Sequence, residues 1–147
     1  MKHINTISIE MPCLPENEAL ARNIAAVFVA MLDPTVEELT EIKTAVSEAV
    51  SNIILHAYEI NQGESIYIKM ESSEFGKIVI AIEDSGKGID DVQKAMEPLY
   101  TTGDCSERSG MGFTVMESFM DKVIVESHPG KGTKVTLIKS LDRLNGF

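Results

Sequence analysis

The chain has 147 residues, of which 44% are hydrophobic, and its formal net charge at pH 7 is -10. This length predicts one domain over residues 1–147, large enough to bury a core without disulfides or a structural metal. Because an acidic surface repels the phosphates of nucleic acids and of anionic lipids, we expect no direct binding to nucleic acid or to membranes.

The N-terminal part of the chain predicts a strand followed by a helix. Apolar residues alternate with polar ones along Ile4–Met11, which is the pattern of a half-buried strand. Residues 16–32 then have helical spacing. The apolar stripe expected on this helix contains Leu20, Ile24, Val27, Phe28 and Met31.

A second helix is predicted to begin at Asp33–Pro34 and to run to about Tyr58. Asp33 can cap the helix, and Pro34 suits its first position. The apolar stripe expected on this helix contains Leu39, Ile42, Val46, Ala49, Val50, Ile53 and Ala57.

The remainder predicts two hairpins separated by a long irregular segment. Strands are expected over Ser65–Glu71 and Ile78–Asp84, and the final hairpin over Val123–Ser127 and Thr133–Lys139. Residues 90–96 could form a short helix, residues 97–112 an irregular loop, and residues 113–122 a helix. Loops of this length inside a compact domain are commonly functional lids or disordered. The layout predicts an α+β fold with the helices on one face of a sheet.

The spacing of the cysteines and the length of the apolar segments indicate the cellular compartment of the protein. Cys13 and Cys105 lie far apart and form no metal-type pair, which favours free thiols in a reducing compartment. The N-terminus lacks the pattern of a secretory signal, and no apolar stretch is long enough to span a bilayer. We therefore expect a cytoplasmic protein.

Three short motifs carry polar chemistry, and each also has an ordinary structural interpretation. Glu48, Asn52 and His56 lie four residues apart and form one line on the second helix, which could be a solvated face or the border of a cleft. In a cleft, Asn52 could offer its amide oxygen to Mg²⁺ and Glu48 could take a proton from a hydroxyl.

The other two motifs contain glycines. "EDSGKGI" places Asp84 at a strand end before Gly86 and Gly88, where a carboxylate can accept a hydrogen bond from an exocyclic amine. "RSGMGF" opens a predicted helix, whose N-terminal amides attract anions. Either stretch could instead be an ordinary turn. The sequence contains no Walker A loop, no dinucleotide fingerprint, no hydrolase serine motif and no metal-type histidine spacing.

The order of these motifs, followed by "GKGT" before the last strand, resembles the N, G1 and G2 boxes of the GHKL ATPase superfamily. The resemblance implies a two-layer α/β sandwich of the GHKL (Bergerat) type, with a mixed sheet, helices on one face and a mobile ATP lid. The segments "DPTVEELTEIKTAVSEAVSN" and "PLYTTGDCSERSGMGFTVMESFMDKVIVES" resemble the anti-sigma-F factors, serine kinases of endospore-forming bacteria. This likeness extends from about Glu16 to Lys139.

The resemblance also implies roles for individual residues. Glu48 would be the base for an attacking serine hydroxyl, and Arg108 would contact the terminal phosphate. Asn52 would be the Mg²⁺ ligand, and Arg22 would contact a sigma factor. The residues implied to bind ATP or ADP are Asn52, Asp84, Gly86, Gly88, Thr101, Ser109, Gly110, Met111, Gly112 and Thr133, with a lid from about Pro98 to Gly112.

The implied function is that of an anti-sigma factor and protein-serine kinase. As a homodimer bound to ATP, it would inhibit the sporulation sigma factor F, and it would phosphorylate a serine of an anti-anti-sigma (STAS) protein. Two alternatives stay open. One is the switch kinase of the anti-sigma-B type, which shares every box. The other is a module that only sequesters a sigma factor, although Glu48 argues against it because sequestration requires no base.

Overall fold

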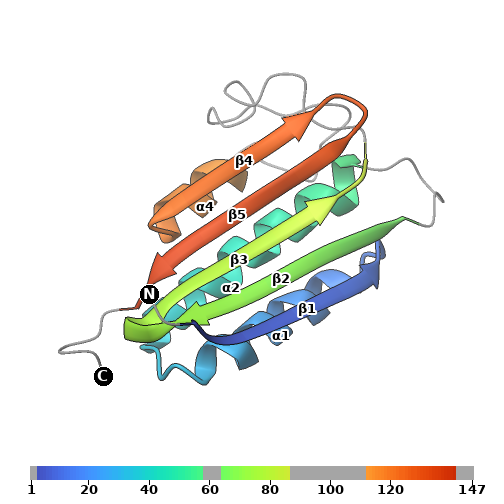
Figure 1. The fold of residues 1–147 in the computed structure, drawn as a ribbon. Helices are drawn as coiled ribbons and strands as arrows, with labels where there is room; N and C mark the ends of the chain where they lie inside the picture. The colour runs from blue at the N-terminus through green and yellow to red at the C-terminus, as the bar shows by residue number, and fades with distance from the viewer. Residues whose placement is uncertain (1–2, 58–63, 87–111, 142–147) are drawn as a thin grey trace.

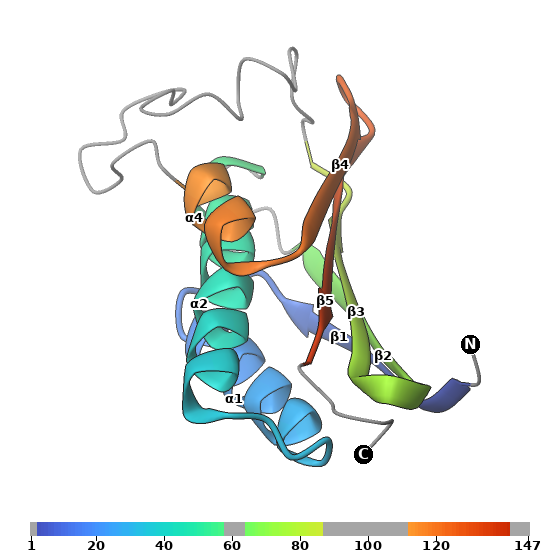
Figure 2. The same ribbon diagram turned by 90° about the vertical axis from the view of Figure 1, so that its left-hand side faces the viewer.

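The computed structural model describes residues 3–57, 64–86 and 112–141. Within these ranges, five strands form one sheet and the helices cover one of its faces (Figures 1 and 2). The strands are β1 (His3–Pro12), β2 (Ser65–Ser73), β3 (Lys77–Asp84), β4 (Lys122–His128) and β5 (Gly132–Ser140). The helical elements are α1 (Asn17–Ala30), α2 (Val36–Asn52), the π-helical turn η1 (Ile53–Ala57), the 3-10 turn η2 (Glu74–Gly76) and α4 (Gly112–Phe119). The predicted two-layer α+β architecture is confirmed.

The strand order is β1-β2-β3-β5-β4, and the described strands pair antiparallel throughout. A mixed sheet was expected, but the strands in residues 3–57, 64–86 and 112–141 contain no parallel pair. The reason is topological. β3 and β4 run in the same direction, but β5 lies between them and runs in the opposite direction.

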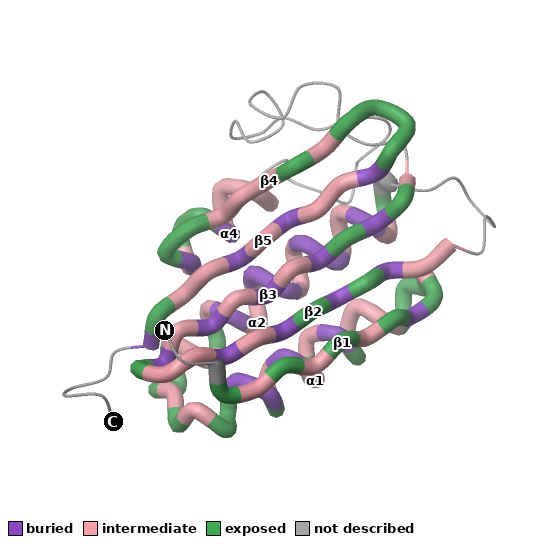
Figure 3. The backbone as a smooth tube through the Cα atoms, in the orientation of Figure 1, coloured by how far each residue is buried: buried purple, intermediate pink, exposed green. Residues whose placement is uncertain are grey.

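The core lies between the sheet and the helices. Alternate residues of the inner strands β2 and β3 are buried, as Figure 3 shows by the regular purple segments along both. On β3 these residues are Ile78, Ile80 and Ile82. Burying one such side chain contributes about 1.5–3 kcal/mol, so this alternation fixes which face of each strand meets the helices.

Helix α2 is the middle helix of its layer and packs beside both α1 and α4. The predicted apolar stripe is confirmed at its centre, where Ile42, Val46 and Val50 are fully buried. The predicted start is wrong. Thr35 caps the helix and forms a reciprocal capping box with Glu38, which satisfies two backbone N–H groups that a cap at position 33 would leave unpaired.

Helix α1 packs on the core through a face that only partly matches the predicted stripe. Ala21, Ala25 and Val29 are fully buried together with Phe28, whereas Leu20, Val27 and Met31 are exposed. The small alanines allow α1 to approach its neighbours closely. Phe28 of the predicted stripe is thus confirmed as a core residue, whereas Leu20, Val27 and Met31 lie at the surface.

The position of α4 is fixed at its C-terminal end. The Lys139 ammonium of β5 donates to the backbone oxygen of Phe119 at 2.7 Å and pairs with the Glu41 carboxylate of α2 at 3.3 Å. A cation at the C-terminus of a helix is favourable because the last carbonyl groups have no partner within the helix. Lys139 therefore ties α4 to both β5 and α2.

Of the helices in the described ranges, none has the length and apolar character that crossing a bilayer requires.

Candidate functional site

One row of side chains crosses all five strands near the end of the sheet. Successive register pairs join Met11, Ile66, Asp84, Thr133 and Ser127, in that spatial order. Directly opposed residues share a face of the sheet, and the buried residues of this row place it on the face that meets the helices. The row is apolar on β1 and β2 and polar on β3, β5 and β4.

Asp84 is the centre of this row. With 4% of its surface exposed, it is one of two buried polar or charged residues in the described part of the chain. Its carboxylate oxygen Oδ1 accepts a hydrogen bond from the backbone N–H of Gly86 at 2.8 Å. Burial raises the pKa of the Asp84 carboxyl, whereas the backbone N–H groups of Gly86 and Thr133 act in the opposite direction. The result is a desolvated acceptor held in one orientation by its own backbone.

The turn between β4 and β5 brings Gly132 against Asp84. Gly132 has a φ of +89°, and a Cβ at this position would overlap the Asp84 carbonyl and lie 2.8 Å from the Cα of Ser85. Only a residue without a side chain fits there. Gly132 therefore sets the distance between the loop after β3 and the start of β5, where Thr133 lies.

Two further candidates lie on the last two turns of α2. Glu48 and Asn52 are both half-buried, one helical turn apart, and Asn52 is the final residue of the α-helix. η1 follows at once, and π-helical turns are frequent at functional sites. His56, the third residue of the predicted line, belongs to this π-helical turn, whose angular spacing differs from that of the α-helix. In Figures 1 and 2 this end of α2 lies at the same end of the molecule as Asp84, where β3 stops.

The predicted phosphate-binding residues fall mainly outside the described residues. Gly112 is the first residue of α4, and this helix packs beside α2. The predicted residues and segments outside the described ranges are Gly88, Thr101, Arg108, Ser109, Gly110, Met111, the helix over 90–96 and the lid up to residue 111.

Arg22, the predicted sigma-factor contact, lies on α1. Its guanidinium pairs with the Glu18 carboxylate at 3.4 Å, and Glu18 also accepts a hydrogen bond from the Ser47 hydroxyl of α2. The Arg22 side chain is 36% exposed. Arg22 is therefore partly available at the surface and held in place by the packing of α1 on α2.

The polar half of the row suits a ligand with an N–H donor. An ionised Asp84 can only accept hydrogen bonds, as an exocyclic amine requires. Asn52 would offer a neutral oxygen ligand of the kind that Mg²⁺ takes, and the metal would offset the charge of the phosphates. The described residues thus fit an amino-purine nucleotide and its metal.

The sequence interpretation missed Gly132 and Ser127. Gly132 is part of the quoted "GKGT", but only a backbone position shows that its Cα faces Asp84. Ser127 and Thr133 are opposed across the β4–β5 hairpin. Their equal distance from the centre of the "HPGKG" turn was the available signal.

Comparison with known families agrees with this geometry. Residues 11–139 match the model of the histidine kinase-like ATPase domain. The chain is 50% identical over 141 residues to an anti-sigma F factor of Clostridium botulinum, covering 96% of this chain and 98% of that one. It is 51% identical over 143 residues to an anti-sigma F factor of Caldanaerobacter subterraneus, covering 97% and 99%.

Solved structures share the fold at low sequence identity. A crystal structure of the RsbU and RsbW domains of a Mycobacterium tuberculosis protein is similar, with a TM-score of 0.70 and 17% identity. The similarity covers 98% of this chain and 34% of that one. The mycobacterial sensor histidine kinase MprB is similar with a TM-score of 0.58 and 12% identity, over 94% of this chain and all of that chain.

Proposed function

Because this chain belongs to the anti-sigma F factors, whose fold is the histidine kinase-like ATPase domain, we propose that it is both an anti-sigma factor and a protein-serine kinase. In this proposal it binds and inhibits the sporulation sigma factor F in the cytoplasm. It uses Mg²⁺-ATP to phosphorylate a serine of an anti-anti-sigma STAS protein. The observation that carries the nucleotide-dependent part is the buried acceptor Asp84, beside Thr133 and at the same end of the fold as Glu48 and Asn52.

In this proposal, one group of residues binds the adenine base and another binds the metal and the phosphates. Asp84 accepts from the adenine amine, Thr133 supports the same edge, and Gly86 and Gly88 let the base approach the backbone. Asn52 holds Mg²⁺, which offsets the charge of the phosphates. The proposed phosphate-binding residues are Thr101, Arg108, Ser109, Gly110, Met111 and Gly112.

In the proposed phosphoryl transfer, Glu48 is the general base. Its carboxylate takes the proton of the substrate serine hydroxyl as that oxygen forms its bond to the γ-phosphorus. The bond from the γ-phosphorus to the bridging oxygen breaks, and ADP leaves with the electron pair of that bond. Positioning and charge neutralisation supply most of the acceleration in such reactions, and Arg108 and Gly112 are the residues proposed to contribute to them.

The direct test uses γ-labelled ATP, Mg²⁺ and the STAS protein from the same organism. We expect label to appear on one serine of the STAS protein, as mass spectrometry would identify, and sigma F to be retained by the ATP-bound protein. Retention of sigma F without any transfer would favour the sequestration-only alternative. Preferential retention of a stress-response sigma factor would favour the anti-sigma-B type of switch kinase.

The metal role of Asn52 predicts a Mg²⁺-specific defect. Replacing Asn52 with alanine should weaken ATP binding about tenfold or more in Mg²⁺ and change it little in EDTA, because only the metal-bound form uses the amide oxygen. Isothermal titration calorimetry in both buffers measures this difference. Ser51→Ala, the neighbouring residue on α2, is the matched control. An Asn52→Ala variant with the wild-type response to Mg²⁺ would refute the role.

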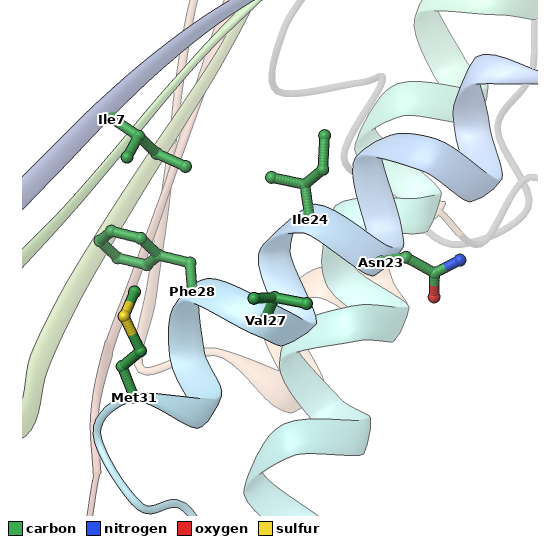
Figure 4. A pocket seen from close by; sticks show the side chains of 6 residues that line it. All are labelled: Ile7, Asn23, Ile24, Val27, Phe28 and Met31. Carbon is green, nitrogen blue, oxygen red and sulfur yellow. The ribbon is translucent and has the colours of Figure 1, made fainter.

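The proposed homodimer has a suitable surface on α1 and β1. Ile7 of β1 points toward Ile24 and Phe28 of α1, and these residues line an open groove together with Asn23, Val27 and Met31 (Figure 4). Val27 and Met31 are 67% and 63% exposed. Within residues 3–57, 64–86 and 112–141, no strand pairs with the outer edge of β1. An apolar groove beside a free strand edge is a typical protein interface.

We propose that a second copy of this chain covers the groove. From Ala19 to Leu32, Arg22 is the one charged residue, whereas the whole chain has a net charge of -10. Two acidic copies repel least where their surfaces carry no charge. A free strand edge is also self-complementary about a two-fold axis, since two copies can pair antiparallel.

Val27→Asp is expected to produce a folded monomer, because the new carboxylate would be desolvated without a partner in the interface. Light scattering after size exclusion should show a dimer for the wild type and a monomer for the variant, with an unchanged circular dichroism spectrum. Arg22→Ala is the companion variant and should stay dimeric while binding sigma F more weakly. A Val27→Asp protein that remains a wild-type dimer would exclude this face.

A further inference from the structure

The polar end of the cross-strand row contains a pair of hydroxyl groups. The Ser127 and Thr133 hydroxyl oxygens lie 2.8 Å apart, and the Ser127 hydroxyl also lies 3.0 Å from the backbone oxygen of Gly132. Both side chains are half-buried on the face that meets the helices. Thr133 is in turn directly opposite Asp84.

The chemistry of these three groups fixes the direction of both hydrogen bonds. A backbone carbonyl can only accept, so the contact with Gly132 requires the single proton of the Ser127 hydroxyl. With that proton directed to Gly132, the bond between the hydroxyls must be donated by Thr133. The Thr133 proton is therefore directed toward β4, and toward its other neighbours the Thr133 oxygen presents lone pairs.

We propose that Ser127 is a positioning residue that holds the Thr133 hydroxyl as an acceptor, and so contributes to selection of 6-amino purines over 6-oxo purines. This inference rests on the proposed nucleotide site. With the Thr133 oxygen beside the Asp84 carboxylate, the site has two neighbouring acceptors. The second acceptor favours a ligand N–H group, or a water molecule that is hydrogen-bonded to such a group. A 6-oxo purine presents a carbonyl oxygen to the same place and would meet lone pairs at both Asp84 and Thr133.

Ser127 acts through Thr133, because Thr133 lies between Ser127 and Asp84 in the row. If Ser127 is removed, the Thr133 hydroxyl loses the group that accepts its proton. It can then rotate and donate to a ligand carbonyl. Selectivity should fall even though neither Asp84 nor Thr133 has been altered.

The test compares the dissociation constants of Mg²⁺-ATP and Mg²⁺-ITP, which carry an amine and a carbonyl at position 6 of the purine. Ser127→Ala should reduce the ratio of the ITP constant to the ATP constant by about three- to tenfold, the size expected for one hydrogen bond. Ser127→Thr keeps the hydroxyl and should keep the ratio. Ser140→Ala, at the other end of β5, is the control for removing a serine hydroxyl from the sheet.

A double-mutant cycle distinguishes positioning from a structural role. In a Thr133→Val background, Ser127→Ala should leave the ratio unchanged, because there is no hydroxyl left to orient. A purely structural role at the turn would weaken ATP and ITP equally and leave the ratio at its wild-type value. That result would overturn the inference while leaving the nucleotide site intact. Failure of the wild type to bind either nucleotide would instead refute the proposed function.

Discussion

Replacing Glu48 with glutamine is expected to slow phosphoryl transfer to the STAS protein by about 100-fold or more while ATP binding persists. Glutamine keeps the size and polarity of the side chain but cannot take up the serine proton. A positioned general base contributes about 10²–10⁴-fold to such a step. Because Glu48 is half-buried on the last turns of α2, the substitution removes a charge without opening a cavity.

The measurement is a single-turnover assay with γ-labelled ATP, together with calorimetric titration of Mg²⁺-ATP. Glu37→Gln is the matched control, since Glu37 is an exposed acid in the first turn of the same helix. It lies 11 residues before Glu48, which is about 16 Å along the helix axis. Transfer at the wild-type rate by Glu48→Gln would show that the base is another group.

Replacing Gly132 with alanine is expected to damage both stability and nucleotide binding. The added Cβ would overlap the backbone of Asp84 and approach Ser85, and neither backbone can move without distorting the central strand β3. Overpacking of this kind costs about 1–3 kcal/mol. It comes on top of the strain of a non-glycine residue at φ +89°, about 1–2 kcal/mol. Displacing Asp84 should weaken ATP binding at least about tenfold.

Gly130→Ala separates these two effects. Gly130 has a similar φ of +77° in the same turn, but a Cβ added there would meet no atom within 4 Å, so the variant carries the backbone strain alone. We expect it to lose about 1–2 kcal/mol of unfolding free energy and to bind ATP normally. Urea unfolding without nucleotide and ATP titration measure the two quantities. Equal ATP affinities for the two variants would contradict the proposed role of Gly132.

The sequence predicts the buried face of an element only where the apolar residues lie on one side of it. The apolar run from Ile78 to Ile82 predicts the strand β3, whereas its core-facing side, with Ile78, Ile80 and Ile82, is established by the structure. Helix α2 has an apolar stripe opposed by charged residues, and its buried face follows. In contrast, α1 is apolar nearly all round, so its periodicity could not distinguish the alanine face from the face with Val27 and Met31.

The candidate site divides in the same way. Asp84 and Asn52 stand out because a polar residue at the end of an apolar element requires an explanation. The contribution of Ser127 depends on strand register and on hydroxyl protons, and that of Gly132 on the approach of two backbone segments. The approach of Gly132 to Asp84 is not local in sequence, so no motif of neighbouring residues contains it. Ser127 and Thr133 are separated by one turn, but the sequence alone does not show which way their hydroxyl protons point.

The cross-strand row also links ligand binding to correct folding of the sheet. If β5 slipped by one residue against β3, Lys134 would replace Thr133 opposite Asp84, and the inward side chains of β5 would all turn outward. Such a misregistered sheet would lack the site. A nucleotide that binds only the correctly paired sheet stabilises it by mass action. Nucleotide in the cell would thus favour folding to the one strand register in which the binding site is complete.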